Sequence, residues 1–96
     1  MNRKLKIERG SSNVFADIGF PPAAAHNLAM RAELVSRIRQ AAKGLTQAEA
    51  ARRFGVTQPR INDLLRGKID KFSLDALVNI LGKAGLRVEV QVRKAA

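Results

Sequence analysis

The sequence contains no cysteine, tryptophan or tyrosine, and its only aromatic side chains are four phenylalanines. Without cysteine the chain can form neither disulfides nor thiolate metal sites, which is typical of proteins of the reducing cytosol. Proteins that bind single-stranded nucleic acid stack the bases on exposed aromatic rings, and this chain has few rings to offer. These absences exclude a disulfide scaffold and argue against a single-strand-binding platform.

Acidic residues are also scarce. There are 8 Asp and Glu against 18 Lys and Arg, so the formal net charge is +10. This excess favours a polyanionic partner, either nucleic acid or an anionic membrane surface. No apolar run is long enough to span a bilayer, and the first ten residues lack the apolar core of a signal peptide. We expect one small cytoplasmic domain, whose thin core a dimer would help to stabilise.

The residue clusters that catalysis requires are missing. The sequence shows no paired carboxylates, no nucleophile beside a histidine, no phosphate-binding glycine loop and no metal-ligand cluster. The single histidine, His26, is expected at the surface because no Cys, His or carboxylate cluster accompanies it. We therefore expect no enzymatic activity, no cofactor and no metal.

The strongest local signals lie between residues 45 and 67, in LTQAEAARRFGVTQPRINDLLRG. Thr46 and Glu49 have the spacing of a capping box, which predicts a helix over about 47–54. Gly55 suits the left-handed residue that commonly ends a helix. This helix is therefore bounded on both sides by its own sequence.

A second helix signal follows directly. Thr57 is a candidate N-cap, and Pro59 falls in the first turn, where its missing N–H costs little. We expect a helix over about 58–66, stopped by Gly67. Its apolar residues share one face at spacings of three and four, namely Ile61, Leu64 and Leu65. An ordinary αα-hairpin would show the same caps and spacing.

Two more helices are expected around this pair. The first spans about 23–42, with an apolar stripe of Leu28, Ala32, Val35, Ile38 and Ala42. The second spans about 74–84 and is capped by Ser73, with a stripe of Leu74, Leu77, Val78 and Leu81. In the loop before it, Ile69 and Phe72 are expected to anchor the chain to the core.

The tail over 86–93 switches to a period of two, which predicts a strand. Its apolar residues are Leu86, Val88, Val90 and Val92. Residues 2–8 alternate more weakly and fit a short strand or a disordered basic arm equally well. A lone strand needs a neighbour, which is the strand near the N-terminus, the tail of a second chain, or both. Pairing between chains would give a two-fold dimer through Val88, Val90 and Val92.

The central segment resembles the helix-turn-helix of the lambda-repressor-like (Xre) family. Gln47 matches the first position of that motif, Ala51 the close crossing of the two helices and Gly55 the turn. The matching buried positions are Val56, Ile61 and Leu64. The resemblance implies a mainly α protein, a bundle of four to five helices with a short C-terminal strand. We divide it into an N-terminal arm (1–22), a DNA-binding domain (23–85) and a dimerising strand (86–96).

The resemblance also implies particular DNA contacts. Gln47 would contact a backbone phosphate, and Gln58, Pro59 and Asp63 fall at the base-facing positions. Two of these depart from the usual pattern, because Pro59 offers only an apolar contact and Asp63 repels phosphates. Side-chain chemistry favours Gln58 for adenine and Arg60 for guanine.

Other contacts follow from chemistry and charge. Asn62 is a third candidate for reading bases, and Thr57 with the free N–H groups near it can meet a phosphate. Arg66 and Lys68 follow the second helix and are expected to contact the DNA backbone. Between residues 37 and 71 there are nine basic and three acidic residues, a surplus of +6. This surplus favours phosphate contact over a merely solvated basic surface.

The chain as a whole resembles short Xre-type antitoxins of the HigA-like kind. The resemblance rests on NVFADIGF (13–20), on the central segment and on FSLDALVNILGKAGLRVEVQVR (72–93). It implies a homodimeric repressor of its own operon that binds a palindromic operator in double-stranded DNA and neutralises a RelE-like mRNA-cleaving toxin. The alternative is a stand-alone, phage-type regulator. Four apolar residues are candidates for toxin binding or, equally, for packing on the chain's own helices: Val14, Phe15, Ile18 and Phe20.

Overall fold

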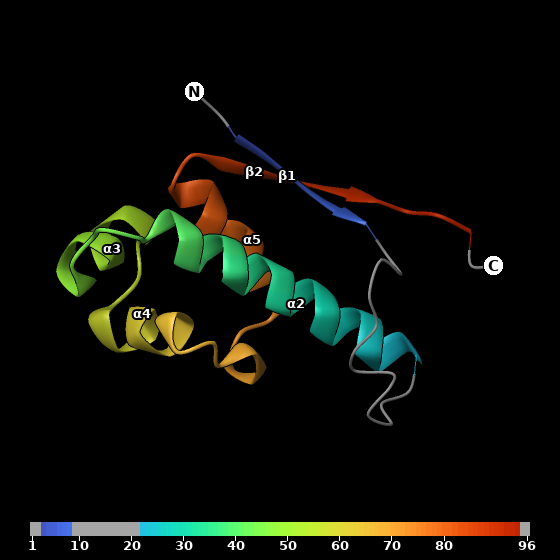
Figure 1. Cartoon of the computed structure of the whole chain (residues 1–96), viewed down its shortest axis with the longest axis horizontal. Helices are drawn as coiled ribbons and strands as arrows, with labels where there is room; N and C mark the ends of the chain where they lie inside the picture. Colours follow the sequence, from blue (N-terminus) through green and yellow to red (C-terminus); the bar gives the residue numbers. More distant parts are fainter. Residues whose placement is uncertain (1–2, 9–21, 95–96) are drawn as a thin grey trace.

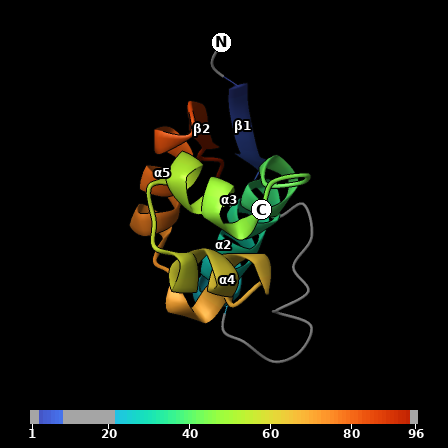
Figure 2. The ribbon, with the colours of Figure 1, turned by 90° about the vertical axis from the view of Figure 1, so that its left-hand side faces the viewer.

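The computed structural model describes residues 3–8 and 22–94 (Figure 1). The elements, in order, are β1 (Arg3–Glu8), α2 (Pro22–Ala41), α3 (Gln47–Phe54), α4 (Gln58–Leu65), the 3-10 turn η1 (Ile69–Lys71), α5 (Leu74–Lys83) and β2 (Leu86–Gln91). The helices gather around the long α2, and the two strands lie together on the α5 side of the bundle, away from α4 (Figures 1 and 2). The expected mainly α helix-turn-helix bundle with a C-terminal strand is confirmed.

The capping box at the start of α3 forms as the sequence predicts. The Thr46 hydroxyl accepts the Glu49 backbone N–H at 3.1 Å, and the Glu49 carboxylate accepts the Thr46 N–H at 2.9 Å. The bond from the Thr46 backbone N–H to the carboxylate is the main cause of a lowered pKa of Glu49, and the Thr46 side chain beside the carboxylate lowers this pKa further. The contribution of Glu49 to stability is therefore present above its unfolded-state pKa and is lost as the pH falls through the folded-state pKa.

The hydrophobic core lies where α2, α3, α4 and α5 meet. Phe54, Ile61 and Leu64 are fully buried there, because the two short helices turn their apolar faces inward. α2 contributes Leu34, Val35, Ile38 and Ala42, and Phe72 closes the loop after α4. Leu28 and Ala32, expected in the stripe of α2, are only half-buried. Phe72 is an anchor as predicted, and Ile69 packs partly buried against the core.

The prediction that Val78 belongs to the buried stripe of α5 is wrong. Val78 is 38% exposed, whereas Ile80, which was not expected in the stripe, is 6% exposed. Both residues are compatible with a helical stripe through Leu77 and Leu81, since they lie on either side of it. The rotation of α5 about its axis selects Ile80 for the core and leaves Val78 on the side facing β2. Leu74 is partly buried.

The neighbour of the tail strand is the strand near the N-terminus. β1 and β2 pair in parallel, with Arg3 opposite Leu86 and Glu8 opposite Gln91. β2 also packs against α5, so Leu86 is buried and Val88 is partly buried against the core. Val90 is 54% exposed and Val92 is 85% exposed. The apolar side of the tail is thus buried at its start and open to solvent at its end.

Gly55, in the turn between α3 and α4, has a φ of 67° and is expected to resist substitution. Gly55→Ala should lower the free energy of unfolding by about 1–2 kcal/mol, because a Cβ disfavours this left-handed conformation. The added Cβ would also lie 2.6 Å from Cδ of Lys83, whose flexible side chain must then move. Chemical denaturation of the purified variant gives this value.

A matched control lies in α5. Gly82 is helical, and a Cβ there would meet nothing within 4 Å. Gly82→Ala should therefore raise the free energy of unfolding by about 0.5–1 kcal/mol, since alanine loses less entropy than glycine in a helix. Equal effects of the two substitutions would contradict the conformational explanation.

Candidate nucleic-acid interface

The helix α4 exposes a polar face opposite its buried one. Its N-cap Thr57 accepts the Arg60 backbone N–H at 3.4 Å, and Pro59 occupies the first turn. With Ile61 and Leu64 buried in the core, the helical period turns Pro59 outward. Gln58 in the first turn, Pro59 and the C-cap residue Arg66 are all exposed. α3 and α4 lie together at one end of the molecule (Figure 2). This end offers a helix with an exposed polar face, and an α-helix is of a size that fits a DNA major groove.

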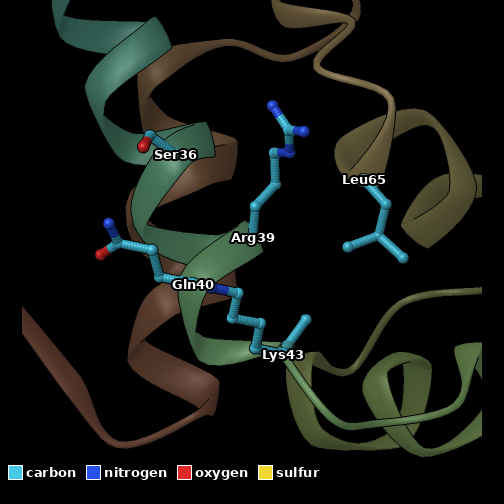
Figure 3. A pocket seen from close by; sticks show the side chains of 6 residues that line it. Ser36, Arg39, Gln40, Lys43 and Leu65 are labelled. Carbon is cyan, nitrogen blue, oxygen red and sulfur yellow. The ribbon is translucent and has the colours of Figure 1, made fainter.

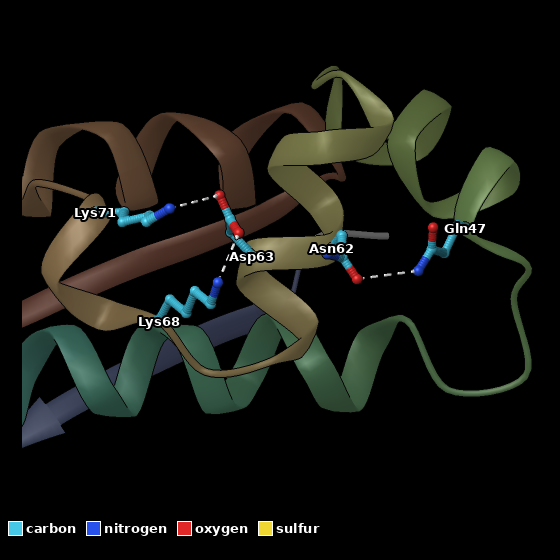
Figure 4. A network of polar contacts seen from close by, with 5 residues as sticks. All are labelled: Gln47, Asn62, Asp63, Lys68 and Lys71. Atoms are coloured by element: carbon cyan, nitrogen blue, oxygen red, sulfur yellow. Dashed lines mark hydrogen bonds and ion pairs between the residues drawn. The ribbon is translucent and has the colours of Figure 1, made fainter.

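A hydrogen bond joins the two helices at this surface. Nε2 of Gln47, the first residue of α3, donates to Oδ1 of Asn62 in α4 at 3.3 Å (Figure 4). Both residues were expected to contact DNA, one at a phosphate and one at a base. The bond places them side by side and leaves the Asn62 amide N–H₂ available as a donor. The sequence could not reveal this bond, because the two residues are fifteen positions apart.

Asp63 is held by two lysines of the following loop. Its carboxylate oxygens lie 3.6 Å from Nζ of Lys68 and 3.7 Å from Nζ of Lys71 (Figure 4). η1 folds the loop back along α4 and so brings these charges together. The sequence suggested that Asp63 would repel phosphates. With its charge opposed by two ammonium groups, the local balance is +1, and the repulsion is largely offset.

The side chain of Arg60 is folded back on the domain. Its guanidinium carbon lies 4.2 Å from the centroid of the Phe72 ring, a cation–π distance. Phe72 itself is 1% exposed, so Arg60 covers the ring. This places the guanidinium at the flank of α4, facing the loop. The assignment of Arg60 to guanine stays a prediction, and it requires the side chain to leave Phe72.

The loop after α4 is anchored by a residue that the sequence did not single out. Arg31 of α2 donates from Nη1 to the carbonyl oxygens of Ile69 and Phe72, each at 3.4 Å. Its Nε is buried without a hydrogen-bond partner among the described residues. No local pattern marks this arginine, because its partners lie about forty residues further along the chain. Arg31 fixes the loop that carries Lys68 and Lys71.

The residues predicted to contact DNA therefore lie on α3, on α4 and in the loop after it, and they have different surroundings. Gln58, Pro59 and Arg66 are exposed on α4, and Thr57 is exposed at its start. The apolar residues proposed for toxin binding, Val14, Phe15, Ile18 and Phe20, lie outside the described residues. In the part of the chain that is described, no group of three or more His, Cys, Asp or Glu could hold a metal ion. None of the helices described combines the length and hydrophobicity needed to cross a membrane.

We expect Gln47 and Asn62 to act on DNA as a coupled pair. Gln47→Ala and Asn62→Ala should each weaken binding to duplex DNA, and the double variant should lose less than the sum of the two. The expected coupling is at least about 0.5 kcal/mol, because each single variant already breaks the shared hydrogen bond. Fluorescence anisotropy with a labelled duplex measures it. Gln47→Ala combined with Arg66→Ala is the control, for which the losses should add.

Comparison with known proteins agrees with this geometry. The chain matches the model of a family described as a helix-turn-helix domain over residues 14–93, which is most of its length. No curated protein matches the chain at a significant level. The match includes α2 to α5 and β2, so it covers the bundle and the tail strand as one unit. A helix-turn-helix domain of this kind indicates a DNA-binding regulator.

Proposed function

We propose that this chain, which belongs to the helix-turn-helix domain family, is a transcriptional repressor whose helix α4 reads double-stranded DNA. The observation that carries the proposal is the exposed polar face of α4, which is backed by fully buried Ile61 and Leu64 and therefore held rigidly. The surplus of +6 between residues 37 and 71 supplies the attraction to phosphate. Gln58 and Asn62 are the proposed base-reading residues, with Arg66 and Lys68 on the backbone.

We further propose that the repressor acts as a two-fold dimer. Val90, near the end of β2, and Val92, just after it, are exposed, and Val88 is half-buried. One edge of β2 pairs with β1, and a strand of a second chain would pair with the other edge. A dimer would bind a palindromic operator with half-sites about one helical turn apart. Val90→Lys with Val92→Lys should then yield a monomer in light scattering, with much weaker operator binding.

The finer proposal is that the repressor is the antitoxin of a type II toxin–antitoxin module. Support comes from the resemblance of three segments to HigA-like antitoxins, namely residues 13–20, 45–67 and 72–93. Its partner would be a RelE-like toxin, bound directly. In the alternative, the same helix-turn-helix serves a stand-alone regulator with no toxin partner. The antitoxin hypothesis predicts a toxin gene beside the gene of this chain, and the stand-alone hypothesis does not.

Two measurements test these proposals separately. A gel shift with the DNA upstream of the chain's own reading frame should show a complex that weakens steeply between about 50 and 200 mM salt; absence of any complex would contradict the repressor. Co-expression with a neighbouring RelE-like reading frame should yield a co-purifying complex and relieve growth arrest. If the neighbour does not bind, the stand-alone regulator is the correct form. Deleting residues 1–20 tests the apolar segment, since retained toxin binding by a folded protein would exclude it.

A further inference from the structure

A pocket beside α4 is lined by side chains to which the sequence assigned no DNA contact (Figure 3). α2 contributes most of its lining, and α4 contributes Leu65; the α2 residues and those just after it are Ser36, Arg39, Gln40, Ala42 and Lys43. The four polar members are exposed, and Leu65 is half-buried. No carboxylate is among the lining residues. The pocket therefore presents hydrogen-bond donors and two positive charges, which is the chemistry of an anion site.

The two cations of this pocket differ from three basic residues of α2 and the loop after α4, which are held in ion pairs. Lys68 and Lys71 are paired with Asp63, and Arg37 is paired with Glu33 at 3.0 Å. Among the described residues, neither Arg39 nor Lys43 forms an ion pair. The C-terminal end of α2 carries only a partial negative charge, which the two full positive charges exceed. Their positive charge is thus available to a ligand.

The position of Arg39 connects the pocket with the α4 surface. Figure 3 shows its side chain extending from α2 into the space beside Leu65. A Cβ placed on Gly67 would lie 3.6 Å from Nη1 of Arg39, so the guanidinium reaches the turn just after α4. A helix in the major groove has a phosphate backbone along each side. With α4 in the groove, a basic pocket beside the end of that helix would lie next to one of these backbones.

We propose that Arg39 and Lys43 bind a backbone phosphate of duplex DNA, with Leu65 against the adjoining sugar. The proposal rests on the proposed DNA binding by α4 and extends that interface to the C-terminal end of α2, where the basic surplus favours phosphate contact but no individual DNA contact is predicted from the sequence. Arginine suits this role because its planar fork donates two hydrogen bonds to one phosphate. The contact carries no base information, so it acts on affinity and on its salt dependence but not on sequence preference.

The test compares two double variants that each remove two positive charges. Arg39→Gln/Lys43→Gln removes the pocket cations, and Arg87→Gln/Lys94→Gln removes exposed cations on and after β2. The probe is a labelled duplex of random sequence, about 30 base pairs long, and its affinity is measured by anisotropy from about 50 to 200 mM salt. For the pocket variant we expect the slope of log K against log salt to flatten by about 0.9 for each bound copy of the chain. The control should keep the wild-type slope.

The outcomes separate the failure of this inference from failure of the proposed function. If the wild type binds and the pocket variant keeps its slope, or if the control flattens equally, the phosphate site is refuted and DNA binding stands. If the wild type does not bind duplex DNA even at about 50 mM salt, both proposals fall. All four substituted residues are exposed, so unchanged thermal unfolding is expected. Arg39→Lys, which retains the charge, should keep the slope and lose only part of the affinity.

Discussion

Replacing Phe54 by alanine is expected to lower the free energy of unfolding by about 3–5 kcal/mol, the cost of truncating a fully buried aromatic side chain. Phe54 is 0% exposed at the end of α3, where it belongs to the core formed with α2, α4 and α5. A small domain is stable by only about 5–15 kcal/mol, so this loss is a large part of the total. Urea denaturation followed by circular dichroism measures it.

Two further variants make the Phe54 result interpretable. Val92 is 85% exposed, and Val92→Ala should change the free energy of unfolding by less than about 0.5 kcal/mol. Phe54→Leu keeps most of the apolar volume and should lie between the wild type and Phe54→Ala. A Phe54→Ala protein as stable as Val92→Ala would mean that α3 does not pack on the core as described.

Replacing Gln58 by alanine is expected to relax sequence preference at one position of the operator and to weaken operator binding by about 1–3 kcal/mol. Gln58 is exposed at the start of α4, where the carboxamide can form two hydrogen bonds with adenine. Selection from a random pool of duplexes identifies the preferred site, and affinity for that site and for random DNA is then compared. Affinity for random DNA should remain unchanged, because phosphate contacts supply it.

Arg60→Ala tests whether a second side chain of α4 reads bases. Its guanidinium is stacked on Phe72, so truncation should lower the free energy of unfolding by about 0.5–1 kcal/mol. If Arg60 also leaves the ring to read guanine, the preferred sequence will change as well. Unchanged operator preference in the Gln58, Arg60 and Asn62 variants alike would refute the assignment of α4 as the helix that reads bases.

Short-range patterns in the sequence were sufficient to predict most of the helical framework. Thr46 and Glu49 interact within one turn, so their spacing alone identifies where α3 begins. The N-cap Thr57 and Pro59 in the first turn identify the start of α4 in the same local way. The left-handed Gly55 follows from the same local reasoning. Three of the predicted helices end within one residue of the observed ones, and the fourth, α3, has the predicted bounds.

Contacts between distant segments were decided only by the tertiary structure. The choice of Ile80 over Val78 for the core depends on how α5 is rotated, which a period of 3.6 leaves open. The pairing of β2 with β1 was one of several alternatives, because an alternating pattern shows that a strand needs a neighbour but does not identify it.

The same division holds for the proposed DNA surface. The sequence by itself determined that a helix-turn-helix with a basic surplus is present, because caps, glycine turns and charge are local properties. The tertiary structure decided how that surface is built: Gln47 bonds to Asn62, Asp63 is opposed by two lysines, Arg60 lies on Phe72 and Arg39 reaches the turn after α4. Most of these contacts join separate elements, and they depend on the packing of α2, α3, α4 and η1, which no short-range pattern encodes.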